Sequence, residues 1–222
     1  MLNLPQSTEV KRPLPKAQLY KRFDWKPSQR ECFDGNVSRL DFVNWIAPRT
    51  VPAIAAGDEV KEIFVVEISL KSHDFDTKAI TLLAKHIPQR IVYLLRYEGE
   101  AMLAVYHTML FSTPWRTVED ISLPLSGLNL DVVWENIVSS IGQFTIEENN
   151  SLSEQIRNDE ERNKLIRQIE ALKKQMNSTK QPRRKRELFS ELAKLTIQIT
   201  PTADARAVHP YKDYGKTTNE KY

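Results

Sequence analysis

Residues 60–70 read VKEIFVVEISL, the strongest strand signal in the chain. The stretch is rich in β-branched residues, which pack well on the pleated surface of a sheet. Because successive side chains point to opposite faces of a strand, one face is apolar throughout and consists of Phe64, Val66, Ile68 and Leu70. The other face begins apolar and ends polar, in the order Ile63, Val65, Glu67 and Ser69. Such a strand is buried on one side and, on the other, is partly solvated or carries a site.

The segments next to this strand predict more strands and a helix. Residues 37–46 alternate imperfectly and are expected to form the preceding strand. Asp76 and Thr77 can cap a helix that runs to residue 86. Two further strands, 90–97 and 101–111, are expected to form a hairpin across a tight turn.

Helices are expected on both sides of these strands. The first covers residues 16–23, and the last covers 128–144, with Asn129 or Asp131 as its cap. Residues 26–35 contain Pro, Ser and Asp-Gly and are interpreted as a turn. The resulting order of elements predicts an α+β fold with a mostly antiparallel sheet and packed helices.

The C-terminal third carries two apolar stripes with the same spacing, here called seams. The first seam is Leu165, Ile169, Leu172 and Met176, and the second is Leu188, Leu192, Leu195 and Ile199. Steps of four, three and four residues place each seam on one side of an α-helix. Between them, Pro182 can open a new helix but cannot continue the old one. The pattern predicts a helical hairpin or coiled-coil arm.

These patterns divide the chain into four parts. Residues 1–12 are polar and are expected to be flexible, and residues 13–146 form the α+β globular domain. Residues 147–199 form the hairpin or coiled-coil arm. Residues 200–222 lack apolar periodicity and are expected to be a disordered tail.

Composition bounds the class of protein. The chain has 222 residues, of which 41% are hydrophobic and 27% are charged, as in ordinary globular proteins. A net charge of +3 does not by itself indicate a nucleic-acid binder, so that case depends on local clustering. One cysteine, Cys32, cannot form an intrachain disulfide, which favours a reducing compartment. Residues 1–10 lack a signal-peptide core and no apolar run has membrane-spanning length, so a cytoplasmic location without a membrane partner is expected.

No motif in the sequence predicts a specific reaction. None of the 6 glycines forms a phosphate-binding loop, so intrinsic ATP hydrolysis and dinucleotide binding are not expected. The four histidines are not at metal-ligand spacing from one another. His73, Asp74 and Asp76 form a cluster that a helix N-terminus explains better than a metal site, and no positive helix end activates Cys32. No catalytic residue, metal or cofactor is therefore expected.

One acidic pattern keeps an enzyme as the alternative. Asp41, with Glu67 and Lys71 on the next strand, has the residue types of a Mg²⁺-dependent nuclease, in which carboxylates hold the metal and a lysine stabilises phosphate charge. The spacing from Glu67 to Lys71 is wider than the Glu-x-Lys of restriction-type nucleases, and no proline precedes Asp41. The competing interpretation is that Glu67 and Lys71 are solvent-facing strand residues.

A basic cluster marks the turn between the two seams. It consists of Lys180, Arg183, Arg184, Lys185 and Arg186. Four consecutive cations at a helix start oppose the helix dipole, which favours anions there. Nucleic-acid phosphate or an acidic patch on another subunit would compensate, and a solvated tip is the alternative interpretation. The seams can bury each other within one chain, a partner helix can add to them, or two copies can pair through the arm.

Three stretches together resemble a bacterial and archaeal family of domains of unknown function. They are LPKAQLYKRF at 14–23, Ile87-Pro88 leading into the strand at 91–95, and RRKRELFSEL at 183–192. Members of that family are encoded beside superfamily-two helicases and DNA methyltransferases, in clusters that resemble restriction or anti-phage systems. The resemblance covers nearly the whole chain and implies a DNA-associated accessory role, but it supplies no catalytic residues.

Together, the patterns and the resemblance predict a non-enzymatic accessory or adaptor protein. Its helical arm is expected to dock on a helicase or DNA methyltransferase, with DNA as a further contact of the basic cluster. The alternatives are a nuclease that uses Asp41, Glu67 and Lys71, and a homodimeric structural protein. The sequence does not fix the oligomeric state.

Overall fold

The computed structural model describes residues 2–146, 151–179 and 181–199. The chain divides into two units, Met1–Ser153 and Glu154–Tyr222, and each is described by itself. Lys180 of the basic cluster lies outside the described residues. The tail at 200–222, which the sequence predicts to be disordered, also lies outside them.

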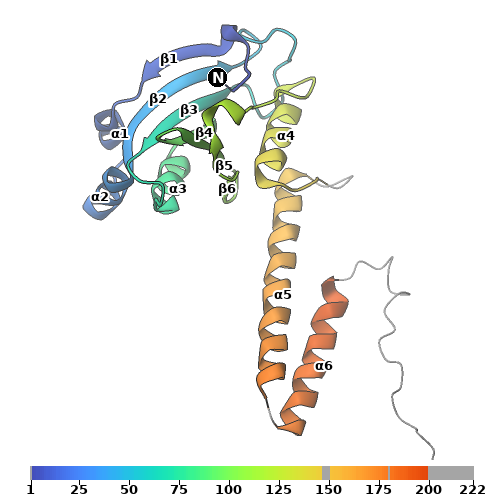
Figure 1. Ribbon diagram of the computed structural model, residues 1–222. Helices are drawn as coiled ribbons and strands as arrows, with labels where there is room; N and C mark the ends of the chain where they lie inside the picture. Colours follow the sequence, from blue (N-terminus) through green and yellow to red (C-terminus); the bar gives the residue numbers. More distant parts are fainter. Residues whose placement is uncertain (1, 147–150, 180, 200–222) are drawn as a thin grey trace, which may run out of the picture. The chain divides into compact units, whose positions relative to one another are not determined.

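Within its described residues, the first unit is built on a seven-stranded sheet (Figure 1). The strands are β1 (Glu9–Pro13), β2 (Val37–Ile46), β3 (Ile63–Leu70), β4 (Arg90–Tyr97), β5 (Glu100–Tyr106), β6 (Leu110–Ser112) and β7 (Arg116–Thr117). They are ordered β1-β2-β3-β4-β5-β6, and β7 pairs with β5. All pairs are antiparallel except β3 with β4, which are parallel because a helix connects them. The prediction of a mostly antiparallel α+β fold is confirmed.

Helices α1 (Lys16–Arg22), α2 (Pro27–Asn36), α3 (Thr77–His86) and α4 (Leu130–Gly142) belong to this unit, with single turns of 3₁₀ helix at Gln6–Thr8 and Val118–Asp120. Two caps follow the sequence prediction. The Asp76 carboxylate accepts the N–H of Lys78 at 2.9 Å, and Asn129 Oδ1 accepts the N–H of Val132 at 3.0 Å. Each cap satisfies a backbone donor that the first turn leaves unpaired.

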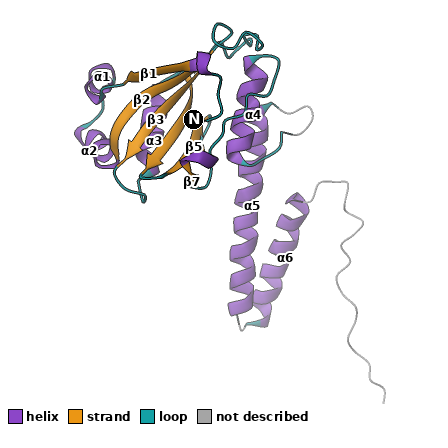
Figure 2. Cartoon of the chain, turned by 45° about the horizontal axis from the view of Figure 1, so that its top comes forward, coloured by secondary structure: helices purple, strands orange, loops and turns teal. Residues whose placement is uncertain are grey.

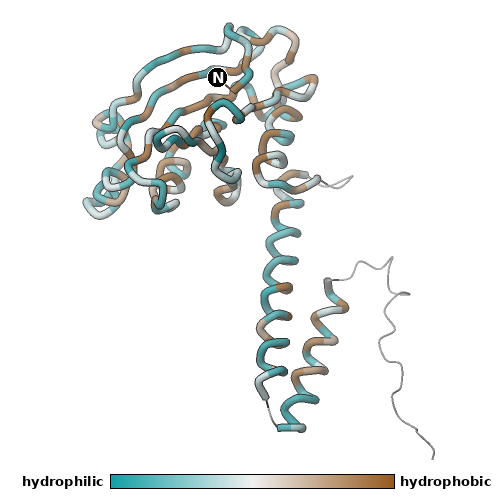
Figure 3. The backbone as a smooth tube through the Cα atoms, in the orientation of Figure 1, coloured by the Kyte–Doolittle hydropathy of each residue, from teal (hydrophilic) through white to brown (hydrophobic). Residues whose placement is uncertain are grey.

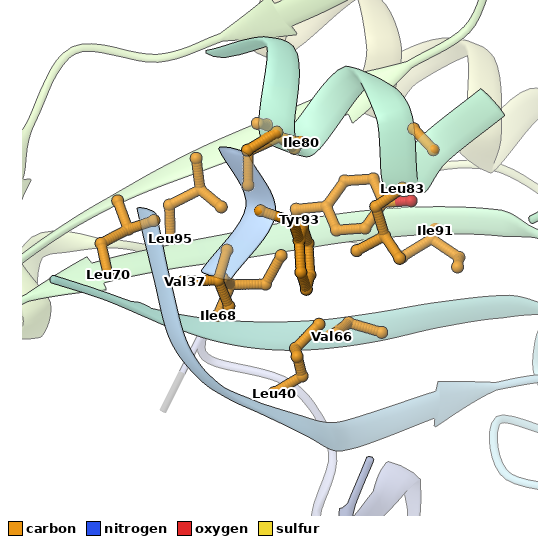
Figure 4. Packing of buried hydrophobic residues seen from close by; sticks show 14 of the residues in the cluster. Val37, Leu40, Val66, Ile68, Leu70, Ile80, Leu83, Ile91, Tyr93 and Leu95 are labelled. Carbon is orange, nitrogen blue, oxygen red and sulfur yellow. The ribbon is translucent and has the colours of Figure 1, made fainter. Parts of the chain in front are cut away.

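One face of the sheet packs against α1, α2 and α3 (Figure 1). The even-numbered residues of β3 lie on this face, as their alternation predicts. The buried cluster that they join includes Val37, Leu40, Val66, Ile68, Leu70, Ile80, Leu83, Ile91, Tyr93 and Leu95 (Figure 4). Burial of this apolar surface is the main term that stabilises the unit.

The opposite face of the sheet changes character along its strands. Ile63 and Val65 are fully buried, and Arg90, the register partner of Ile63, has its guanidinium 5.6 Å from the ring centroid of Trp134 in α4. Helix α4 therefore covers this end. Toward the other end, the same face carries Glu67 and Ser69, which are only half-buried. The half-polar face that the sequence predicts is present.

The prediction of a turn at residues 26–35 is wrong, because this stretch forms α2. Pro27 occupies the first helical position, where its missing N–H costs nothing. The Gln29 side chain accepts the N–H of Lys26 at 2.8 Å, and Phe33 is fully buried. The Pro-Ser and Asp-Gly signals therefore lie at the two ends of a short helix.

Two other boundaries differ from the sequence prediction. Residues 2–12, expected to be flexible, hold a buried Leu2 and most of β1, because β1 pairs with β2 and Asn44 Nδ2 donates to Thr8 Oγ1 at 2.8 Å. The single strand expected at 101–111 is divided into β5 and β6 by a turn in which the His107 N–H donates to the Met109 carbonyl at 3.1 Å.

The second unit is a helical hairpin. Its helices are α5 (Leu152–Ser178, which begins in the first unit) and α6 (Pro182–Ile199), and α6 runs back beside α5 in both views (Figures 1 and 2). Burial follows the seam spacing: Ile169 and Leu188 are buried, and Leu165, Leu172, Met176, Leu192 and Leu195 are half-buried. The side chain of Ile199 is outside the described set. No helix among the described residues combines the length and the apolarity needed to cross a membrane.

Candidate functional site

The register of the sheet brings two of the three predicted nuclease residues together. Asp41 of β2 lies directly opposite Glu67 of β3. Directly opposed residues of a ladder point to the same face, and this face is the half-polar one. A β-bulge between Phe42 and Asn44 keeps Asn44 on that face as well, opposite Val65.

Each carboxylate is paired with an arginine from the same face. Arg39 Nε lies 2.6 Å from Asp41 Oδ2, and Arg96 Nη1 lies 3.1 Å from Glu67 Oε1. The carboxylate side chains are only 16% and 17% exposed, so they need these cations to offset the cost of burial. Hydrogen bonding and the charge of Asp41 raise the pKa of Arg39.

A cavity of about 380 Å³ opens over this charge cluster. It is lined by the carboxylates of Asp41 and Glu67, by the ion pair of Glu9 and Lys11, and by Arg39, Asn44 and Ser69, among others. The cavity is large enough for a small polar ligand or a phosphate group. The structure therefore has a polar recess where the strand sequence predicts a solvated face or a site.

Lys71 does not join Asp41 and Glu67 at this cavity. Its backbone N–H donates to the Asn36 carbonyl at 2.9 Å, and its charge acts on Asp34 at the end of α2. Ser69 stands two residues after Glu67, where a Glu-x-Lys motif has its lysine. The predicted set of three is therefore incomplete at the cavity.

The carboxylates do not fit a divalent cation as they stand. Arg39 and Arg96 already hold them, so an ion would have to displace both guanidinium groups. Within the described part of the chain, no three His, Cys, Asp or Glu side chains are grouped so that they could hold a metal ion.

The cluster around His73 is a packed helix start. Asp76 caps α3, while the His73 ring stacks on Trp115 with centroids 4.5 Å apart and its Nε2 lies 3.4 Å from the Glu100 carboxylate. Nearby, burial and then the negative charge of Asp76 raise the pKa of the Cys32 thiol. A raised pKa disfavours the thiolate, so Cys32 is not an activated nucleophile.

The basic residues at the start of α6 are exposed. Arg183 and Arg184 approach the Glu187 carboxylate at 3.7 and 3.1 Å. In the described residues, Lys185 and Arg186 have no acidic partner within ion-pair distance. A single carboxylate thus faces four cations at the helix end that repels positive charge.

Charge is segregated along the chain, which the overall net charge conceals. Residues 162–199 contain eleven Lys and Arg against three Asp and Glu, a net charge of +8. Residues 1–161 contain 17 Lys and Arg against 23 Asp and Glu, a net charge of −6. A count over segments of the sequence detects this asymmetry, which the total of +3 does not reveal.

Comparison with known proteins identifies a family for the chain. A family model described as domain of unknown function, DUF4391, matches residues 2–199. No curated protein and no solved structure matches the chain. Because the matched segment includes both the sheet and the hairpin, the chain belongs to the DUF4391 family of domains of unknown function.

Proposed function

We propose that this protein is a non-enzymatic accessory subunit of a DNA-processing system, with the hairpin as its contact element. The observation that supports this most is the net charge of +8 on residues 162–199 beside a first unit of opposite sign. A basic surface of this kind attracts nucleic-acid phosphate through release of condensed counterions. Phosphate also relieves the unfavourable placement of Arg183–Arg186 at a helix start.

The test is the salt dependence of duplex DNA binding, measured by fluorescence anisotropy. Replacing Arg183, Arg184, Lys185 and Arg186 with Ser should lower the slope of log K against log salt by about 0.9 for each phosphate that the variant no longer neutralises. The matched control replaces Lys21, Lys26, Lys78 and Lys85, four exposed cations of the first unit, and removes the same charge. An equal decrease in slope in the two variants would show that only net charge matters and would refute the assignment.

The partner in this proposal is a helicase or a DNA methyltransferase, as the family resemblance implies. Such an enzyme encoded beside this chain should co-purify with the intact protein. A chain that ends at residue 146 keeps the sheet and loses the hairpin, so it should lose the enzyme. Equal recovery of the enzyme with both chains would contradict docking through the hairpin.

A second candidate, a divergent Mg²⁺-dependent nuclease, is favoured by one observation. Asp41 and Glu67 lie opposite each other on one face, above a cavity of about 380 Å³. Lys71 does not line the cavity, so any activity would use the two carboxylates and the neighbouring Arg39 and Arg96.

Cleavage of supercoiled plasmid in Mg²⁺ or Mn²⁺ tests this candidate. Asp41→Asn and Glu67→Gln should each abolish cleavage, whereas Lys71→Ala should leave it unchanged. Absence of cleavage by the intact protein, or cleavage that survives both substitutions, would eliminate the nuclease.

A further inference from the structure

The hairpin exposes apolar side chains that its seam does not use. Among the described residues of α5 and α6, Ile166 is 37% exposed, Phe189 60% and Ile197 75%. Hydrophobic positions recur along α6, whereas α5 is mostly hydrophilic (Figure 3). An exposed Phe on a short helix is notable because aromatic side chains are the ones that most often anchor interfaces.

Two of these side chains, Ile166 and Phe189, share one side of the hairpin. Ile166 follows the seam residue Leu165, and Phe189 follows Leu188, so each is turned about 100° from its seam. In an antiparallel pair the two chains run in opposite directions, and the two seams also face in opposite directions. These two reversals cancel. Equal rotations from the seam therefore point to the same side. Ala193, four residues after Phe189, extends the row along α6, and Ile197, four residues further, lies about 80° around the helix from Phe189, on the outer side of α6.

The surroundings of this apolar row are basic. At helical spacing from Ile166 lie the cations Arg162 and Lys173 and the acids Asp159 and Glu170. At three and four residues before Phe189 lie Arg186 and Lys185. Four cations and two carboxylates thus border the apolar residues Ile166, Phe189, Ala193 and Ile197, which are here called the docking face.

We propose that the docking face binds an amphipathic helix of a partner protein whose apolar stripe is flanked by Asp and Glu. This inference rests on the proposed accessory function and specifies the chemistry of the partner. An incoming helix would bury Phe189 and Ile197 and complete a three-helix bundle, the packing that helices with two apolar sides adopt. Its acidic flanks would pair with the four cations at the border.

Charge decides against the two other occupants. A second copy would bring another hairpin of the same sign, net +5 over residues 152–199, against the first, and like charges across an interface are unfavourable. A nucleic-acid backbone matches the cations but offers no apolar surface to cover Phe189 and Ile197. Only an acidic helix complements both the row and its border.

The probe for this proposal is a synthetic helical peptide of about 20 residues, long enough to span the hairpin. It carries Leu and Ile at intervals of three and four residues, flanked by Glu, and its matched partner carries Lys in place of Glu. Binding of each peptide to the full chain is measured by fluorescence anisotropy. The acidic peptide should bind, and Phe189→Ser and Ile197→Ser should each weaken it at least about tenfold.

Leu128→Ser is the control variant, because Leu128 is 86% exposed and lies in the first unit. It should leave peptide binding unchanged. Equal binding of the acidic and basic peptides, or equally weakened binding in Leu128→Ser, would overturn the docking face. Self-association of the chain that Phe189→Ser abolishes would identify a second copy as the occupant and would also overturn it.

Failure of the docking face is separable from failure of the proposed function. The salt slope of DNA binding depends on the cations at the start of α6, whereas the peptide result depends on Phe189 and Ile197. If Phe189→Ser changes DNA binding as strongly as the four-Ser variant does, nucleic acid occupies the face and the helix proposal is wrong. An unchanged salt slope together with abolished peptide binding supports it.

Discussion

Asp131 ties the connection before β3 to the first turn of α4. Its carboxylate accepts the backbone N–H groups of Asp58 at 2.6 Å, Val60 at 2.7 Å and Glu59 at 3.2 Å. A Cβ on Gly57 would overlap this carboxylate, which explains the glycine. The bond from Val60 lowers the pKa of Asp131, and the bonds from Asp58 and Glu59 add to this effect against a smaller opposing contribution from burial.

Asp131→Ala should therefore lower the free energy of unfolding by about 1–2 kcal/mol at neutral pH, since it leaves backbone donors unpaired. The pKa of Asp131 is lower in the folded state than its unfolded value of about 3.9, so the ionised carboxylate stabilises the folded state above that pH. This stabilisation is lost as the pH falls through the folded-state pKa. The difference in Tm between the wild type and Asp131→Ala should shrink below about pH 4. Asp58→Ala keeps the backbone donor and is the control. A difference in Tm that is constant with pH would contradict the assignment.

Cys32 should react slowly with thiol reagents. Burial, followed by the charge of Asp76, raises its pKa, so less thiolate is present at pH 8 than for free cysteine. Asp76→Asn keeps a capping side chain for α3 and removes the charge, and it should speed alkylation by iodoacetamide. Because the chain has one cysteine, mass spectrometry follows the reaction directly. A rate that is unchanged in Asp76→Asn would show that burial alone sets the pKa.

Within the hairpin, two adjacent residues of α6 separate the seam from the docking face. Leu188 is 1% exposed and Phe189 is 60% exposed. Leu188→Asp buries a carboxylate in the seam, which costs several kcal/mol, and should lower the helical signal in circular dichroism. Phe189→Asp removes a larger apolar side chain but from an exposed position, so it should leave that signal unchanged. An equal decrease in helix in both variants would refute the seam.

The elements that the sequence predicts well are those with a strong local pattern. The alternation of β3, the Asp76 cap of α3 and the Asn129 cap of α4 are set by neighbours in the chain, so they can be recognised without tertiary information. Strand β1 has no such pattern, because its five residues are all exposed and only pairing with β2 defines it. Local signals therefore predict most of the sheet but not its edge.

Helix α2 illustrates stabilisation by distant residues. Asp34 accepts from Lys16 Nζ at 2.9 Å and from Tyr20 Oη at 2.6 Å, and both donors come from α1. Burial works against ionisation of Asp34, but these two bonds together with the positive charges of Lys16 and Lys71 outweigh it and lower the pKa of Asp34. A ten-residue segment that depends on such contacts has a weak helix signal of its own.

The candidate sites show the same limit. The residue types Asp41 and Glu67 are visible in the sequence, but their direct opposition depends on the bulge of β2, which no periodicity rule predicts. Arg96, which pairs with Glu67, comes from a third strand. Only the structure at the end of β3 shows that Lys71 does not line the cavity. The charge of residues 162–199, in contrast, needs no structure, because it is counted from the sequence alone.

For the complete chain, segregated charge bears on the oligomeric state. If the docking face takes an acidic partner and not a second copy, sedimentation equilibrium at low ionic strength should give the mass of one chain, 25.7 kDa. Repulsion between two hairpins is strongest under those conditions, because salt screens it. A dimer at low salt that persists in Phe189→Ser would favour the homodimeric alternative through a different surface.

Of the two register shifts in β2, the bulge between Phe42 and Asn44 has a consequence for changes of chain length. Phe42 pairs with Val66 and Asn44 with Val65, so Val43 is an extra residue in the ladder. An in-frame deletion of its codon would leave every other residue of β2 on its present side. A one-codon deletion at Leu40 would shift the neighbouring residues by one and move charged side chains toward the apolar cluster. A one-codon deletion in this strand should therefore be tolerated at Val43 and rejected at Leu40.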